Sequence, residues 1–171
     1  MVTTPTQAEK PDIRVIVATM EHLDVLTDYQ CRLAYDTEGK KLDQNRVRNA
    51  VETVIKNPAL GCHYLAWDKN DPTRKFIGTT LVTYEISVQL GGMVHWIRGV
   101  YTDNAARGKG VYKALHEHVL MVAKDDQNVK DVRLYVVYKN KVAQAVYEKL
   151  EMKRMSDQKL IEKDLDFAMK L

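Results

Sequence analysis

Hydrophobic positions in the first third of the chain predict one strand followed by two helices. Residues 13–18 (IRVIVA) are mainly apolar, which is typical of a strand. Apolar residues then recur at helical spacing over residues 20–36, until the polar segment 36–41 (DTEGKK) interrupts them. Asp43 is a suitable N-cap for a second helix, whose apolar residues recur at three- and four-residue steps. The Asn-Pro pair at 57–58 ends this helix, because a residue before proline avoids helical backbone angles.

The remaining pattern predicts three consecutive strands and then an alternation of helices and strands. Gly91 and Gly92 separate the second and third of these strands and predict a two-residue hairpin turn. This order of elements indicates an α/β (α+β) fold with three layers, α/β/α, around a mixed, largely antiparallel sheet. The elements expected after residue 60 are strands 61–67, 76–88 and 94–102, helix 109–123, strand 132–138, helix 141–150 and a strand near 154–161.

Composition adds the expectation of one soluble domain. The chain has 171 residues, of which 45% are hydrophobic and 29% charged. We expect residues 1–11 to form a disordered tail and residues 12–171 a single domain. No apolar run approaches the roughly 20 residues of a membrane span, and the N-terminus resembles neither a signal nor a transit peptide, so we expect a cytoplasmic protein without a membrane partner. The formal charge of +3 comes from scattered lysines, so no nucleic-acid partner is expected.

The cysteines and histidines do not indicate a metal site or a disulfide framework. Cys31 and Cys62 are predicted on a helix and a strand, where they suit buried reduced thiols, and neither has the surroundings that activate a nucleophile. His116 and His118 are two residues apart on a predicted helix and therefore point to opposite sides. We expect no metal.

The segment 107–110 (Arg-Gly-Lys-Gly) joins a strand to a helix and carries the clearest chemistry of the chain. A helix N-terminus presents N–H groups that its own turn cannot satisfy, and glycines let an anion approach them closely. This pattern predicts a phosphate or pyrophosphate cradle, although an ordinary strand-to-helix connection has the same composition. A Walker A loop is excluded because Val111 follows Gly110, and a dinucleotide fingerprint is excluded because position 113 is Lys.

Two motifs, one after the other along the chain, resemble motifs of the GCN5-related N-acetyltransferase (GNAT) family. Residues 107–112 (RGKGVY), after the strand end Val100-Tyr101-Thr102, are similar to the family's Arg-x-x-Gly-x-Gly/Ala acetyl-CoA motif. Residues 140–152 follow strand residues 134–136 and look like the family's Asn-x-x-Ala-x-x-x-Tyr-x-x-Leu-Gly-Phe/Met block. The resemblance covers residues 12 to about 158.

This resemblance implies acetyl-CoA as co-substrate, bound where the sheet splays apart. The backbone of Val100 and Thr102 would pair with the pantetheine amides, and the loop would bind the pyrophosphate through its N–H groups. Tyr112 departs from the family's Gly/Ala, but in the first turn of the helix its side chain could lean outward while its N–H faces the phosphate, so we expect binding to survive. The cofactor-binding residues implied are Val100, Tyr101, Thr102, Arg107, Gly108, Lys109, Gly110, Val111, Tyr112 and Asn140.

The second motif contains the implied general acid. Asn140 is a suitable N-cap, and the resemblance adds a contact with the cofactor. Tyr147 lies seven residues later on the same helix face, where the family's tyrosine protonates the leaving thiolate; a core tyrosine is the other interpretation. Glu151 replaces the family's glycine, which puts the helix C-cap in doubt.

The general base and the acceptor site are less defined. Trp96 occupies the position of the family's basic glutamate and cannot accept a proton. A two-residue turn would place Glu85 opposite Arg98 on the face of Trp96, which makes Glu85 the first candidate base and a cross-strand ion pair the alternative. His95 would face the other side. Glu38, in the loop between the first two helices, and the aromatic residues Tyr84, Trp96 and Tyr101 are candidates for binding the acceptor.

These observations favour an acetyl-CoA-dependent N-acetyltransferase in which a primary amine attacks the thioester directly in a ternary complex. The acceptor class, a small-molecule or a protein amine, stays open. A non-catalytic acyl-CoA-binding or sensing module is the alternative that the missing glutamate favours, and retention of Tyr147 argues against it. Edge strands of this fold often pair in a homodimer, but no sequence feature decides the oligomeric state.

Overall fold

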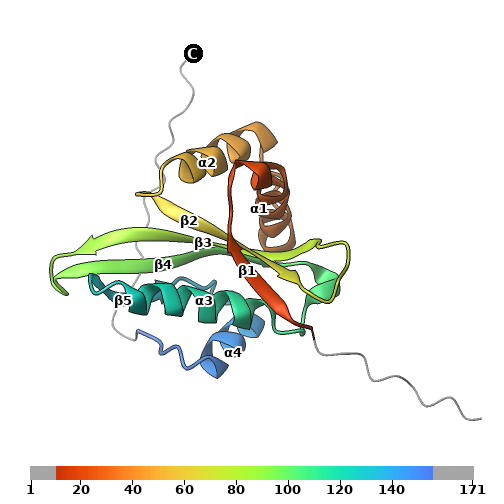
Figure 1. Cartoon of the computed structure of the whole chain (residues 1–171). Coiled ribbons are helices and arrows are strands. Elements are labelled where there is room, and N and C mark those ends of the chain that lie inside the picture. Colours follow the sequence, from red (N-terminus) through yellow and green to blue (C-terminus); the bar gives the residue numbers. More distant parts are fainter. Residues whose placement is uncertain (1–10, 156–171) are drawn as a thin grey trace, which may run out of the picture. The chain divides into compact units, whose positions relative to one another are not determined.

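A mixed five-stranded sheet forms the centre of the structure, a computed structural model that describes residues 11–155 (Figure 1). The strands lie in chain order, β1 to β4 antiparallel to their neighbours and β5 parallel to β4. The chain forms two compact units, Met1–Tyr135, which contains the sheet, and Val136–Leu171. The strands are β1 (Ile13–Val17), β2 (Gly61–Asp68), β3 (Phe76–Ser87), β4 (Gly92–Thr102) and β5 (Val129–Leu134).

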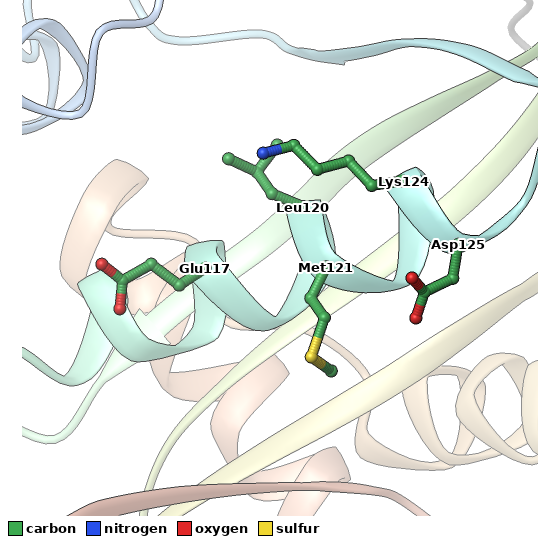
Figure 2. A pocket seen from close by; sticks show the side chains of 5 residues that line it. All are labelled: Glu117, Leu120, Met121, Lys124 and Asp125. Atoms are coloured by element: carbon green, nitrogen blue, oxygen red, sulfur yellow. The ribbon is translucent and has the colours of Figure 1, made fainter.

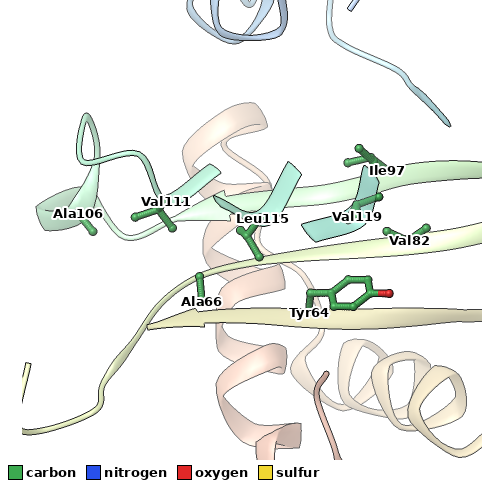
Figure 3. Close-up of a cluster of buried hydrophobic side chains, with 8 residues drawn as sticks. All are labelled: Tyr64, Ala66, Val82, Ile97, Ala106, Val111, Leu115 and Val119. Atoms are coloured by element: carbon green, nitrogen blue, oxygen red, sulfur yellow. The ribbon is translucent and has the colours of Figure 1, made fainter. Parts of the chain in front are cut away.

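Helices cover both faces of this sheet, which confirms the predicted three-layer α/β architecture (Figure 1). Helices α1 (Leu23–Glu38) and α2 (Gln44–Lys56) pack on one face through a core that includes Leu26, Val51 and Leu65. Helix α3 (Val111–Asp125) packs on the other face. The core beneath α3 consists of Tyr64, Ala66, Val82, Ile97, Ala106, Val111, Leu115 and Val119 (Figure 3).

Several element bounds differ from the sequence-based prediction. Helix α1 continues to Glu38, so that Glu38 is its last residue instead of a loop residue, and Gly39 ends the helix at a φ of 66°. Strand β5 begins and ends earlier than the predicted strand 132–138, and residues 135–138 are exposed. Most of the predicted tail 1–11 and of the strand near 154–161 lies outside the described residues.

The β3–β4 hairpin corrects the predicted register. Ser87 pairs with Gly92, so that the connection spans the four residues 88–91 instead of the two glycines. Gly91 closes it with a φ of 67°, whereas Gly92 belongs to the strand, where a Cβ would come within 2.3 Å of the Asn128 carbonyl oxygen. Glu85 therefore lies opposite Val94 and not opposite Arg98, and the expected cross-strand pair was wrong.

A bulge near the end of β4 turns its last side chains. Leu81 pairs with Arg98 and Thr79 with Tyr101, which leaves two β4 residues, Gly99 and Val100, opposite the single residue between them on β3. Gly99 has a φ of 52°, which suits glycine. Tyr101 consequently packs in the core beneath α1, whereas Val100 packs against the core beneath α3.

The second unit contains helix α4 (Lys141–Lys149), whose ends are both capped. The Asn140 side chain accepts a hydrogen bond from the Ala143 N–H at 3.0 Å, which confirms its role as N-cap. At the other end, the N–H groups of Glu151 and Met152 donate to the carbonyls of Glu148 and Tyr147 at 3.0 and 3.1 Å. These two bonds form a Schellman motif, so the cap survives the loss of glycine.

Glu151 takes the left-handed conformation that this motif requires, with a φ of 63°. Because a left-handed backbone costs a residue with a Cβ roughly 1–2 kcal/mol, Glu151→Gly should raise the free energy of unfolding by about 1 kcal/mol. Denaturant unfolding would measure the gain. Glu151→Ala is the matched control, since alanine also carries a Cβ, and equal stability of the two variants would contradict the explanation.

His63 on β2 is almost completely buried, and its Nδ1 has no hydrogen-bond partner among the described residues. Burial lowers the pKa of His63 from 6.5 to about 4. Between these pH values the unfolded chain binds a proton that the folded chain excludes, so stability falls as the pH falls through this window. We expect a loss of up to about 3 kcal/mol between pH 7 and pH 4.

Unfolding measured at several pH values in wild type and His63→Gln checks this expectation. The variant should show a flatter dependence of the unfolding free energy on pH, with a remaining slope from His95, His116 and His118, whose pKa values burial also lowers. An identical slope in wild type and variant would assign the acid sensitivity to other groups.

Candidate active site

Strands β4 and β5 stop pairing before β4 ends, which leaves one edge of β4 open. The last pair between β4 and β5 joins Ile97 to Leu134, yet β4 continues to Thr102. Beyond Ile97, β4 pairs with β3 only, among the residues that the structure describes. We call this stretch, residues 98–102, the open edge of β4.

The backbone groups on the open edge have a definite direction. The Asp103 N–H donates to the Ile77 carbonyl at 2.9 Å, so Asp103 directs its backbone groups to β3. Because this direction alternates along a strand, Tyr101 also faces β3, whereas Val100 and Thr102 direct their N–H and C=O groups away from it. These two residues therefore direct backbone groups to the open edge, where no other strand pairs with them among the described residues.

The glycine loop follows this strand and leads into α3. Gly108 and Gly110 have φ values of 76° and 85°, and a Cβ at either position would meet nothing within 4 Å. Gly110 is the N-cap of α3 and offers no side chain to its first turn. The N–H groups of Gly110 and Val111 have no acceptor among the described residues. Open space, unpaired donors and the positive end of the helix dipole therefore meet in this loop.

Two cations flank the loop, and one of them also has a structural role. Arg107 donates from Nε to the Thr102 carbonyl at 3.3 Å and forms an ion pair with Asp36 of α1 at 3.2 Å. These contacts connect the loop to the end of β4 and to α1. Lys109 is exposed and adds positive charge.

Tyr112 does not lean outward, which corrects the prediction for its side chain. The residue is half-buried, its hydroxyl oxygen is buried, and its ring lies 5.8 Å from the ring of His116. Because Tyr112 lies in the first turn of α3, its backbone N–H belongs to the N-terminal end of the helix. The bulky side chain thus packs inward and leaves the front of the loop open.

In the second unit, Tyr147 lies on α4 and is half-buried. Burial raises the pKa of its phenol above 10.0. The hydroxyl is therefore protonated at neutral pH and able to donate a proton. On the same helix, the Gln144 amide donates to the carbonyls of Val137 and Tyr138 at 3.2 and 2.8 Å, which ties the preceding segment to α4.

The aromatic residues expected in one acceptor pocket lie on different faces of the sheet. Tyr84 pairs with His95 on the α3 face, and their rings are 4.7 Å apart. Trp96 points to the opposite face, because successive side chains of a strand alternate. Tyr101 is buried in the core beneath α1. These three side chains therefore do not line a common pocket.

The two acidic candidates are also separate. Glu85 is exposed on β3, on the face of Trp96. Glu38 forms an ion pair with Lys40 at 2.6 Å at the end of α1. As predicted, His95 faces the other side of the sheet from Trp96, and burial lowers its pKa.

Sequence reasoning missed a cluster on the face of Trp96. The indole of Trp96 stacks on the ring of Tyr135, with centroids 4.5 Å apart and an interplanar angle of 15°. The Arg98 guanidinium carbon lies 5.3 Å from the Trp96 centroid and 4.9 Å from that of Tyr135. We call Trp96, Arg98 and Tyr135 the Arg98 cluster. The two-residue spacing of Trp96 and Arg98 was the available signal, but the wrong hairpin register assigned Arg98 to Glu85.

A shallow hollow on the outer side of α3 carries no comparable chemistry. Its lining residues all come from that helix and are Glu117, Leu120, Met121, Lys124 and Asp125 (Figure 2). Within residues 11–155, no three acidic, histidine or cysteine side chains are grouped to hold a metal ion. None of the helices in that range is long and apolar enough to span a membrane.

Comparisons with known proteins agree with this geometry. A sequence model of the acetyltransferase (GNAT) family matches residues 22–152. A search of curated proteins found no significant match. A possible acetyltransferase from Clostridium difficile 630 is 29% identical, with a TM-score of 0.81, and the alignment covers 90% of this chain and 97% of that one.

Two further structures share the fold at lower identity. A predicted acetyltransferase from Clostridium acetobutylicum, solved with acetyl-CoA, is 16% identical with a TM-score of 0.70, covering 88% of this chain and 96% of that one. Glucosamine-6-phosphate N-acetyltransferase from Arabidopsis thaliana is 19% identical with a TM-score of 0.65, covering 89% and 99%. The family match spans most of the chain and includes both the open edge and the glycine loop. The chain belongs to the GNAT family of acetyltransferases.

Proposed function

We propose that this protein is an acetyl-CoA-dependent N-acetyltransferase that transfers an acetyl group to a primary amine. The observation that carries this proposal is the open edge of β4 directly before the glycine loop. The pantetheine arm of acetyl-CoA is an extended chain with amide groups, which an unpaired strand edge can bind. The pyrophosphate lies at one end of this arm, and the glycine loop follows directly after the open edge. The C. acetobutylicum neighbour solved with acetyl-CoA supports the same ligand for this chain.

The residues present fit acetyl-CoA. Val100 and Thr102 would pair with the pantetheine amides as an added strand does. The first-turn N–H groups of α3 would bind the pyrophosphate, with Lys109 and Arg107 adding charge. A hydrogen bond to a charged acceptor contributes about 1.5–3 kcal/mol, so three or four such bonds would dominate the affinity. Arg107 would have to share its guanidinium between Asp36 and the phosphate.

The reaction requires a nucleophile, a leaving group and two proton transfers. A neutral amine attacks the thioester carbonyl and forms a tetrahedral intermediate in the ternary complex. The C–S bond then breaks, Tyr147 donates its phenolic proton to the thiolate, and the amide nitrogen loses its extra proton. No cysteine nucleophile is needed. The role of Tyr147 rests on its place in the second motif and on its protonated phenol.

Glu85 is the candidate for the base that removes the proton from the amine. It lies opposite Val94, four residues before Arg98, which corresponds to about 13 Å along the strand. Glu85 can therefore serve a reaction at the open edge only through a chain of water molecules. Its exposure supports such a relay, and Glu38 would act at most by attracting a cationic amine.

The alternative function is a non-catalytic acyl-CoA sensor, which Trp96 favours because it replaces the family's glutamate. Release of CoA from acetyl-CoA across a panel of amines, with cofactor affinity measured by calorimetry, distinguishes the two. CoA release that depends on an amine would support the enzyme. Tight binding without release would favour the sensor, and absence of binding would exclude both.

A further inference from the structure

Three N–H donors near the start of the open edge have no acceptor among the described residues. The guanidinium of Arg98 is exposed, and it forms no ion pair with any residue of the described range. The indole Nε1 of Trp96 is buried without an acceptor, as is the amide Nε2 of Gln30 on α1. Gln30 lies beside the bulge, with Nε2 3.0 Å from the place of a Cβ at Gly99. Buried donors such as those of Trp96 and Gln30 need an acceptor, which a water molecule or a ligand can supply.

The Arg98 cluster holds its guanidinium in a defined position. Arg98 is the first residue beyond the last β4–β5 pair, so its side chain leaves the strand where the open edge begins. The rings of Trp96 and Tyr135 support the guanidinium through cation–π contacts. Neither contact is a hydrogen bond, so the guanidinium N–H groups remain available to an oxyanion, which their planar fork can bind in a bidentate manner.

The charges around this position favour an anion. Arg133 lies 5.9 Å from the Trp96 ring, on the same face, and pairs with Asp131 at 2.8 Å. Asp131 is therefore neutralised within its own pair. Glu85 of β3 also lies on this face, four strand positions away. Neither Asp131 nor Glu85 therefore pairs with Arg98.

We propose that the acceptor amine carries an anionic group, a carboxylate or a phosphate, and that Arg98 binds this group. Trp96 and Gln30 supply further donors to it or to its solvation shell. This inference rests on the proposed N-acetyltransferase function and names its substrate class. It excludes simple polyamines as good acceptors, since their additional positive charge would be repelled by the guanidinium.

Matched acceptor pairs test the inference. The pairs are an α-amino acid and its carboxamide, which isolates a carboxylate, and glucosamine 6-phosphate and glucosamine, which isolates a phosphate. In wild type we expect kcat/KM for one anionic member to exceed that of its neutral partner by about 10- to 100-fold, as one charge-assisted bond allows. The pair that shows the preference identifies the anion.

Arg98→Gln should abolish this preference, because glutamine keeps an N–H donor but loses the charge. Arg74→Gln is the matched control, since Arg74 also lies over a tryptophan, 5.5 Å from the centroid of Trp67. The control should keep the wild-type ratio between the two members of a pair. Equal kcat/KM values within both pairs, or an unchanged ratio in Arg98→Gln, would overturn the inference.

Trp96 provides a readout that does not require turnover. In a Trp67→Phe background it is the sole tryptophan, since the chain contains two. With the cofactor site saturated by CoA, glucosamine 6-phosphate or the amino acid should change its fluorescence, and Arg98→Gln should weaken this binding about 10-fold or more. No response to either anion would refute the inference. Failure of CoA to bind would instead refute the proposed function.

Discussion

Gly110→Asp is expected to weaken acetyl-CoA binding by about 100-fold or more, as measured by calorimetry. Gly110 is the N-cap of α3, and space lies open where its side chain would be. An aspartate there would place a carboxylate on the N–H groups that the proposed function assigns to the pyrophosphate, and it would repel the phosphates. Because aspartate tolerates left-handed backbone better than most residues, the variant should still fold.

Gly91→Asp controls for the backbone conformation. Gly91 has a φ of 67° and, like Gly110, has open space at its Cβ position, but it lies in the β3–β4 connection. It should bind acetyl-CoA with wild-type affinity. Gly110→Asn, which has the same shape without the charge, should lose less affinity than Gly110→Asp. Wild-type affinity in Gly110→Asp would show that the glycine loop does not bind the pyrophosphate.

Tyr147→Phe is expected to lower kcat by about 10²-fold while acetyl-CoA affinity stays within about twofold, because general acids contribute about 10²–10⁴-fold to rate. The substitution removes only the hydroxyl, whose pKa burial raises and which is therefore protonated at neutral pH. Steady-state kinetics with the acceptor identified in the amine panel, together with calorimetry, would measure both quantities.

Tyr138→Phe is the matched control in the same unit. Tyr138 is exposed, and its ring contacts the Lys141 ammonium at 4.1 Å. The control should turn over at the wild-type rate. If Tyr147→Phe also retained full activity, the thiolate would have to leave without Tyr147 as its proton donor, and water would be the next candidate.

Local patterns in the sequence were sufficient for the order of the elements and for the helix caps. Asp43 and Asn140 were recognised as N-caps because the interaction spans only three residues, and both accept the expected bond. The glycine loop was recognisable for the same reason. Its two left-handed residues and the helix start follow from a few neighbouring positions.

Features that depend on register were not predictable in the same way. The hairpin contains two adjacent glycines, and Gly92, the one that belongs to β4, is distinguished by the close approach of Asn128, which precedes β5 in the chain. The assignment of these two glycines sets the register of β3 against β4, and in the observed register Arg98 lies opposite Leu81 instead of Glu85. The bulge at Gly99 then reverses the direction of Tyr101, which no periodic pattern reveals. The Arg98 cluster therefore became visible only in three dimensions.

The short length of the open edge has a consequence for aggregation. An unpaired strand edge can template the addition of foreign strands, and segments of six or seven residues suffice for amyloid-like pairing. Here five residues, 98–102, remain after the last pair with β5, a length of about 16 Å. An invading strand would meet β5 at one end and the end of β4 at the other. The protein can thus leave this backbone open to a ligand without offering a surface on which chains polymerise.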